Sequence, residues 1–269
     1  MDILGYLAAA VMGISLGLVG GGGSILTVPI LVYFFKQDPL IATSSSLFIV
    51  GATAFVGAIF NARKKLVDFK TGLLFALPSF TGVFTARHFL LPLIPDHIAS
   101  IAGFSLTKSI LIMSLFGIIM VLAARAMIFS SRKNTKLLST KPQRDSTKTL
   151  TIIWQGFFIG ITTGFVGAGG GFLIIPALVM LLNLPMKLAI GTSLAIIAAN
   201  SFFGFALSSA NIYFDWFFLL KITTIGIFGI AIGQFYSSKV NENALKRWFG
   251  YFVLSIGSFV ILDQIFNMI

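Results

Sequence analysis

The sequence predicts an all-α polytopic membrane protein made of two inverted repeats, each with a glycine-broken re-entrant helical hairpin and three transmembrane helices. Three observations predict this fold. Hydrophobic residues make up 57% of the chain and the mean hydropathy is +0.99, which is too apolar for a soluble domain of 269 residues. A glycine-rich motif occurs twice in corresponding places, and the basic residues gather in particular turns.

The composition also excludes several classes of protein. The apolar runs reach the roughly 20 residues that a helix needs to cross a bilayer, and they lack the alternation of a transmembrane β-barrel. The chain has no cysteine, which excludes disulfides, thiolate metal sites and cysteine nucleophiles. Its net charge of +11 is carried between apolar runs, so we expect lipid headgroups, and no nucleic acid, as partners.

The first repeat is expected to cover residues 1–124. An apolar segment over residues 3–19 leads into the run Gly17-Leu18-Val19-Gly20-Gly21-Gly22-Gly23-Ser24. Each glycine costs roughly 1 kcal/mol in a helix interior, so the run predicts a break in the helix. Ser24 is available to cap a shorter helix over residues 24–35. Three membrane spans should follow, over residues 40–60, 71–87 and 98–124.

The second repeat, residues 151–269, follows a basic linker over residues 125–150 that we place in the cytoplasm. Its run Gly164-Phe165-Val166-Gly167-Ala168-Gly169-Gly170-Gly171 copies the first at an offset of 147 residues, and Pro176 follows it as Pro29 follows the first. The offset holds without a gap, which predicts an internal duplication. The expected segments are 151–167, 171–182, 188–208, 216–236 and 248–266.

The charges of the turns decide how the repeats face. If residues 3–35 crossed the membrane once, the basic turn over residues 239–247 would face outside, against the positive-inside rule. If each glycine run is the tip of a hairpin that enters and leaves on one face, this turn, the linker and the 61–70 turn all face the cytoplasm. The repeats are then inverted and their tips lie near the bilayer centre, as is typical of secondary transporters.

The predicted site lies where the two glycine tips would approach each other. Helices that start there would direct free backbone N–H groups into the space between them, which favours an anion. Hydroxyls near the start of two spans would add neutral donors, while the acidic residues all fall in turns, ends or the linker, which disfavours a cation pathway. The expected substrate-binding residues are Gly20, Gly21, Gly22, Gly23, Ser24, Ser44, Ser45, Ser46, Gly167, Ala168, Gly169, Gly170, Gly171, Thr192, Ser193 and Asn200.

Each of these features also has a purely structural interpretation. The glycines would allow close helix packing, the hydroxyls commonly bond back to helix carbonyls, and Asn200 would form an interhelical hydrogen bond. Arg87 and Lys108 would either attract an anion or, as the sequence favours, extend to the lipid interface. His88 and His97 have no third ligand nearby, so we expect no metal site, and we expect neither a catalytic residue nor a cofactor.

The doubled Gly-x-x-Gly-x-Gly-Gly motif, with a proline after each copy and a Ser/Thr-rich start to the next span, resembles the sulfite exporter TauE/SafE family of bacterial membrane proteins. The resemblance covers both repeats. It implies a multi-pass protein of the bacterial cell (inner) membrane that moves small sulfur-containing or organic anions. Ala168 stands opposite Gly21 and Gly191 opposite Ser44 at the repeat offset, so the two sides of the site are not expected to be equivalent.

We therefore expect a secondary transporter of a small anion, such as sulfite or an organosulfonate, that works by alternating access with the anion between the two glycine breaks. A passive anion channel and a transporter of small organic carboxylates on the same scaffold are the alternatives. The lack of cysteines, intramembrane carboxylates and a histidine cluster argues against an enzyme. The expected partners are the anion and the bilayer, and a homo-oligomer is left open.

Overall fold

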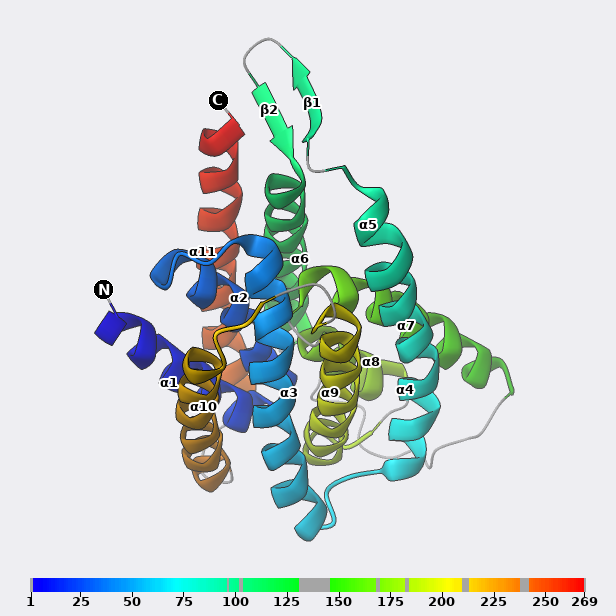
Figure 1. Ribbon diagram of the computed structural model, residues 1–269. Helices are drawn as coiled ribbons and strands as arrows, with labels where there is room; N and C mark the ends of the chain where they lie inside the picture. Colours follow the sequence, from blue (N-terminus) through cyan, green and yellow to red (C-terminus); the bar gives the residue numbers. More distant parts are fainter. Residues whose placement is uncertain are drawn as a thin grey trace.

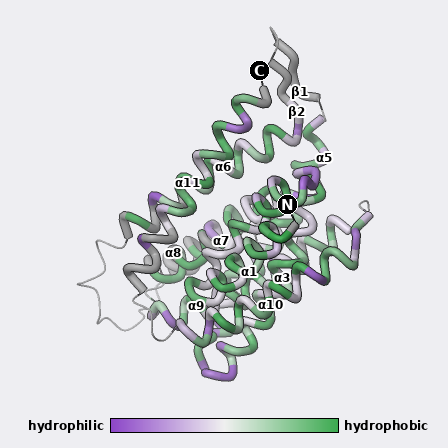
Figure 2. Tube along the Cα trace, turned by 90° about the vertical axis from the view of Figure 1, so that its left-hand side faces the viewer, coloured by the Kyte–Doolittle hydropathy of each residue, from purple (hydrophilic) through white to green (hydrophobic). Residues whose placement is uncertain are grey.

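The computed structural model describes residues 2–95, 97–101, 104–130, 146–167, 170–181, 184–209, 213–237 and 242–268. Within these residues the protein is a bundle of helices with one short hairpin of strands (Figure 1). Apolar residues run along most of the helices, and hydrophilic residues gather at turns and helix ends (Figure 2). Four described helices are long and apolar enough to cross a membrane, namely Pro39–Arg63, Phe69–Leu93, Met186–Ser208 and Trp216–Tyr236.

The first glycine run breaks the first helix, as predicted. Helix α1 (Asp2–Val19) ends where Gly20 adopts a φ of 73°, a conformation that is easy only for glycine. The chain then turns helical again at once. It passes through a 3₁₀ helix, a short α-helical turn and a π-helical turn, which are η1 (Gly21–Leu26), α2 (Thr27–Pro29) and η2 (Ile30–Phe34).

The remainder of the first half contains three helical segments and one hairpin. The segments are α3 (Pro39–Arg63), a continuous helix made of α4 (Phe69–Phe84), η3 (Thr85–Leu90) and α5 (Leu91–Leu93), and α6 (Lys108–Ser130). Strands β1 (His97–Ile101) and β2 (Phe104–Thr107) pair antiparallel before α6.

Two expectations about the first half are wrong. Ser24 does not cap a helix, because the helical chain restarts at Gly21 and the Ser24 hydroxyl donates to the Gly21 carbonyl at 2.7 Å inside the 3₁₀ turn. The span expected from residue 98 begins only at Lys108. The stretch before it contains Phe104-Ser105-Leu106-Thr107, whose alternation of apolar and polar residues favours a strand.

The second half repeats the first. Gly167 and Gly170 have φ values of 70° and 63° and separate the first two of its helices, so the second predicted break is also confirmed. The helices of this half are α7 (Ser146–Val166), α8 (Gly171–Leu181), α9 (Met186–Ser208), α10 (Trp216–Tyr236) and α11 (Glu242–Met268). Their bounds lie within a few residues of the expected segments, except that α7 and α11 begin five and six residues earlier.

The helices pack across the two halves. Helix α1 packs on α10, α4 on α7, α3 on α9 and α6 on α11. The first two pairs are equivalent at the repeat offset, and their closest approaches agree. A Cβ on Gly229 would meet the carbonyl of Ala10, and a Cβ on Gly82 would overlap that of Phe157, which is the residue 147 positions after Ala10. The duplication seen in the sequence is therefore present in the packing.

The four apolar helices α3, α4, α9 and α10 have two distinct ends. The α3–α4 turn, the start of α9 and the end of α10 lie at the lower end in Figure 1, and the start of α3, the end of α9 and helix α5 lie at the upper end. Each end carries a group of polar residues.

Candidate functional site

Arg87 is the centre of the polar group at the upper end. It lies on the π-helical segment η3 and its guanidinium reaches two other helices. Its Nη1 donates to the hydroxyl of Ser44 on α3 at 2.8 Å and to the hydroxyl of Ser208 on α9 at 2.7 Å. The guanidinium thus joins the first half of the protein to the second.

The two serines are oriented to accept from Arg87. The Ser44 hydroxyl donates its hydrogen to the carbonyl of Leu40 at 3.1 Å, and the Ser208 hydroxyl donates to that of Gly204 at 2.8 Å. Each hydroxyl has a single hydrogen, so only its lone pairs remain for Nη1. Both Nη1 hydrogens are satisfied in this way.

The other edge of the guanidinium is buried without a partner. Nε and Nη2 of Arg87 are shielded from solvent and make no hydrogen bond with any residue that the structure describes. This edge presents two parallel N–H groups, the fork that binds carboxylates and phosphates through two oxygens. Burying such donors unpaired is unfavourable, so the edge is suited to an oxyanion.

The sequence identified Arg87 but favoured the lipid interface for it, and this interpretation is wrong. The two serine contacts hold the guanidinium against α3 and α9 instead. Lys108, the other basic candidate, is the first residue of α6 and is only partly buried. That helix packs on α11, and the hydrogen bonds of Arg87 do not involve Lys108.

The two glycine runs meet each other. A Cβ on Gly21 would overlap the backbone of Gly171, and the reverse also holds. Gly167 lies against the backbone of Thr43, and its carbonyl accepts a hydrogen bond from the hydroxyl of Ser46. At Gly21 and Gly171 the backbones of the two glycine runs are in direct contact, so these two glycines allow close packing. Ala168 and Gly169 lie outside the described residues.

The predicted hydroxyl residues divide between the two ends. Ser44 and Ser46 lie near Arg87 and the second glycine run, and Ser45 is buried beside them in α3. Thr192 lies near the other end, where its hydroxyl accepts from the backbone N–H of Asp68 at 2.9 Å. The Ser193 hydroxyl donates back to a carbonyl of its own helix.

Asn200 lies between these groups and links two helices. Its side-chain Nδ2 donates to the hydroxyl of Ser79 on α4 at 2.6 Å, and both residues are fully buried. The interhelical hydrogen bond considered from the sequence is therefore present. Its Oδ1 has no partner among the described residues, which leaves one polar atom of Asn200 for a ligand.

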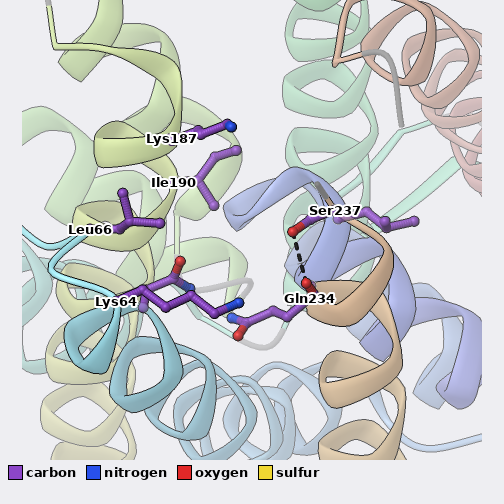
Figure 3. A pocket seen from close by; sticks show the side chains of 9 residues that line it. Lys64, Leu66, Lys187, Ile190, Gln234 and Ser237 are labelled. Atoms are coloured by element: carbon purple, nitrogen blue, oxygen red, sulfur yellow. Dashed lines mark hydrogen bonds between the residues drawn. The ribbon is translucent and has the colours of Figure 1, made fainter. Parts of the chain in front are cut away.

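A cavity opens at the lower end, and the sequence did not predict it. It has a volume of about 140 Å³. Figure 3 shows Lys64 extending across it toward Gln234, with Lys187 and Ile190 on another wall. The residues that line it are Gly17, Leu18, Asn61, Lys64, Leu66, Lys187, Ile190, Gln234 and Ser237. They include two lysines and no carboxylate.

Two amides fix one wall of this cavity. The side chains of Asn61 and Gln234 both donate to the carbonyl of Gly57, at 2.9 and 3.0 Å. The sequence did not mark Asn61 and Ser208 as site residues, because a polar residue is common near a helix end. The signal that relates them is the repeat, since they are separated by 147 positions.

Comparison with known proteins places these features in context. The family model described as "Sulfite exporter TauE/SafE" matches residues 5–260. A "Probable membrane transporter protein" of Xylella fastidiosa (strain 9a5c) is 28% identical over 94% of this chain and 92% of its own length. "Probable membrane transporter protein YunE" of Bacillus subtilis is 25% identical over 98% and 97%. No solved structure matches the chain.

Proposed function

The chain belongs to the sulfite exporter TauE/SafE family, whose relatives are named probable membrane transporters, and on this premise we propose that it is a secondary transporter of a small oxyanion. The cargo is sulfite or another small sulfur-containing anion, such as an organosulfonate, and the protein works in the bacterial inner membrane. Small organic carboxylates are the second class of cargo, because they present the same pair of oxygens to a guanidinium.

The observation that carries this proposal is the unpaired edge of Arg87. Its Nε and Nη2 are buried without a partner among the described residues, while Nη1 is held by Ser44 and Ser208. A sulfite or sulfonate group can place two oxygens on that edge. Arg87 therefore supports the oxyanion class, and the family supports sulfur as its central atom.

The packing supports alternating access between inverted halves. The α1–α10 pair and its repeat counterpart, the α7–α4 pair, pack in equivalent ways. The glycine runs touch with backbone alone at Gly21 and Gly171. Two halves that meet at such a contact can rock against each other, which is the motion that inverted repeats commonly use. We propose that the anion passes beside this contact.

The proposal is tested by measuring the melting temperature of the purified protein with sulfite, sulfate, sulfoacetate, acetate, choline and glycerol. A ligand that binds only the folded state raises the melting temperature. We expect the sulfur oxyanions to do so most in the wild type, less in Arg87→Lys, which keeps the charge without the fork, and least in Arg87→Gln. Arg125→Gln, which removes an exposed arginine of α6, is the matched control and should respond like the wild type.

Two outcomes would overturn the proposal. One is stabilisation by choline or glycerol alone. The other is an unchanged sulfite response in Arg87→Gln. Uptake into proteoliposomes then separates a transporter from a passive anion channel: we expect saturable uptake, whereas conduction near channel rates would exclude alternating access.

A further inference from the structure

The cavity at the lower end is the repeat-related counterpart of the Arg87 group. Gln234 stands 147 positions after Arg87, and Ser208 stands 147 positions after Asn61. Both members of each pair occupy equivalent structural positions. The side chain of Asn61 donates to the carbonyl four residues before it, as does that of Ser208. Gln234 approaches Asn61 at the Gly57 carbonyl, as Arg87 approaches Ser208.

The positive charge is supplied differently at the two ends. Gln234 is neutral where the upper end has Arg87. The lower cavity instead has Lys64 and Lys187 on its walls, and the residues at their repeat positions, Asn211 and Leu40, are uncharged. The duplication alone therefore does not explain the two lysines, which add to the cavity the charge that Gln234 lacks.

Lys187 also lies at a helix start that carries no side-chain cap. It is in the first turn of α9, whose N-cap residue Pro185 makes no capping hydrogen bond. The first N–H groups of a helix carry a partial positive charge. The ammonium groups, this helix end and the absence of Asp and Glu from the lining all favour an anion in the cavity.

We propose that the Lys64–Lys187 cavity is a second anion station, which takes the same small oxyanion as Arg87 but at the opposite end of the protein. This inference rests on the proposed function, because it takes the cargo from it. Lysine ammonium groups attract as point charges and lack the fork of arginine. The station therefore binds more weakly than the Arg87 edge, discriminates less among oxyanions, and loses affinity as ionic strength rises.

One introduced cysteine can report on this cavity, because the chain has no cysteine of its own. Ser237 lines the cavity, so Ser237→Cys places one thiol there. We measure the rate at which N-ethylmaleimide alkylates it in the purified full-length protein, with and without sulfoacetate, at constant ionic strength kept with potassium chloride. Bound sulfoacetate should slow the reaction, and the concentration dependence gives an apparent affinity.

Lysine variants in the same background make the test specific. Lys64→Gln with Lys187→Gln should lower the apparent affinity by roughly fivefold, since both lysines are exposed and exposed ammonium groups each contribute modestly. Lys70→Gln with Lys65→Gln removes the same charge from the same end of the protein. Neither residue lines the cavity, so this matched control should retain protection.

The possible results separate the two proposals. If sulfoacetate raises the melting temperature of the Ser237→Cys protein but does not slow alkylation, the second station is wrong and the proposed function stands. An unchanged apparent affinity in the Lys64→Gln, Lys187→Gln protein also overturns the second station. If none of the tested oxyanions changes either the melting temperature or alkylation, the proposed function fails and this inference fails with it.

Discussion

At the scale of single residues, Arg87 shows how a charge can be kept ready for a ligand. Burying an ion costs several kcal/mol unless it is paired, and the two serines satisfy only one of its three nitrogens. An oxyanion on the remaining edge would complete the set. The same residues that hold the guanidinium belong to both halves of the protein, so binding there would also strengthen the contact between α3, η3 and α9.

Asp68 gives a prediction for a residue outside the membrane spans. It caps α4 and accepts hydrogen bonds from the backbone N–H groups of Lys70 and Thr71 and from the Thr71 hydroxyl. Burial raises the pKa of its carboxyl, but these hydrogen bonds outweigh burial and hold the pKa below its usual value. A lowered folded-state pKa adds stability above the unfolded pKa of about 3.9, and this stability is lost as the pH falls through the folded value.

This prediction is tested by measuring melting temperatures at a series of pH values from neutral to acidic. The wild type should lose more stability below about pH 4 than Asp68→Asn, which keeps a capping oxygen but does not titrate there. Asp215→Asn, at the repeat-equivalent cap of α10, is the matched control, because Asp215 accepts from the backbone N–H of Phe218 and from no hydroxyl among the described residues. The prediction would be contradicted if the melting temperatures of the wild type and Asp68→Asn fell equally with decreasing pH.

The sequence identified the types of residue at the site better than their partners. Arg87, Ser44 and Ser46 were all candidates, but the contact of Arg87 with Ser208 depends on how α9 packs beside η3. Ser208 looks like an ordinary polar residue at a helix end. The cavity could not be predicted for the same reason. Lys64 at the end of α3 and Lys187 at the start of α9 are brought together only by the fold.

At the scale of elements, the glycine breaks have two separate causes. Gly20, Gly167 and Gly170 have positive φ values, which explains where the helices stop. Gly21 and Gly171 are needed for a different reason, because any side chain at either would overlap the backbone of the other run. In each run, one glycine therefore allows the backbone to turn (Gly20 or Gly170), and the next allows the contact between the halves (Gly21 or Gly171).

Gly21→Ala tests the second cause. Its methyl group has no space against Gly171, so we expect a loss of about 1 to 3 kcal/mol from overpacking. Gly72→Ala in α4 is the matched control, since its Cβ would lie 3.6 Å from the Thr192 side chain, an ordinary contact. It should be neutral or more stable by about 0.5 to 1 kcal/mol, from helix propensity.

The measurement is the melting temperature of both variants and of the wild type, each purified in mild detergent. Equal melting temperatures for Gly21→Ala and Gly72→Ala would show that the two glycine runs do not form the close contact. A transport assay on Gly21→Ala then shows whether the contact matters for movement as well as for stability.

Helix positions were easier to predict than the structure between helices. Long apolar runs fixed α3, α9 and α10 to within a few residues of the expected spans. Hydropathy does not distinguish a short apolar strand from a helical turn, so the sequence predicts a span where the structure has the β1–β2 hairpin. The early restart at Gly21 was missed because a serine is a common cap, whereas a 3₁₀ turn needs no side-chain cap.

At the scale of the whole molecule, each half completes the other. Helix α1 packs on α10, α4 on α7, α3 on α9 and α6 on α11, so every one of these pairs crosses between the halves. The first half would expose the faces that α7, α9, α10 and α11 cover in the full chain. The repeat offset in the sequence predicted a duplication but could not reveal which copies would pack together.

This arrangement predicts that the halves must be produced together. Residues 1–130 and 146–269, expressed as separate chains with a tag on the first, should co-purify, because the helix pairs do not depend on a covalent link. Expressed alone, either fragment should aggregate or be degraded. Gly82→Leu in the first fragment should weaken co-purification, since a side chain there overlaps the Phe157 carbonyl. A single fragment that is stable and monodisperse alone would contradict the conclusion that each half depends on helix pairs with the other.

The burial of Arg87 has an electrical consequence. The voltage across a membrane acts on every charge that moves through it, with about 2.3 kcal/mol per elementary charge at 100 mV. An anion that leaves a negatively polarised cell moves down this voltage, and it needs no second ion to drive it. If Arg87 stays in place while the anion passes, the full charge of the anion feels the field. Outward transport by this protein would then draw its energy from the cell's own polarisation and would slow when that polarisation collapses.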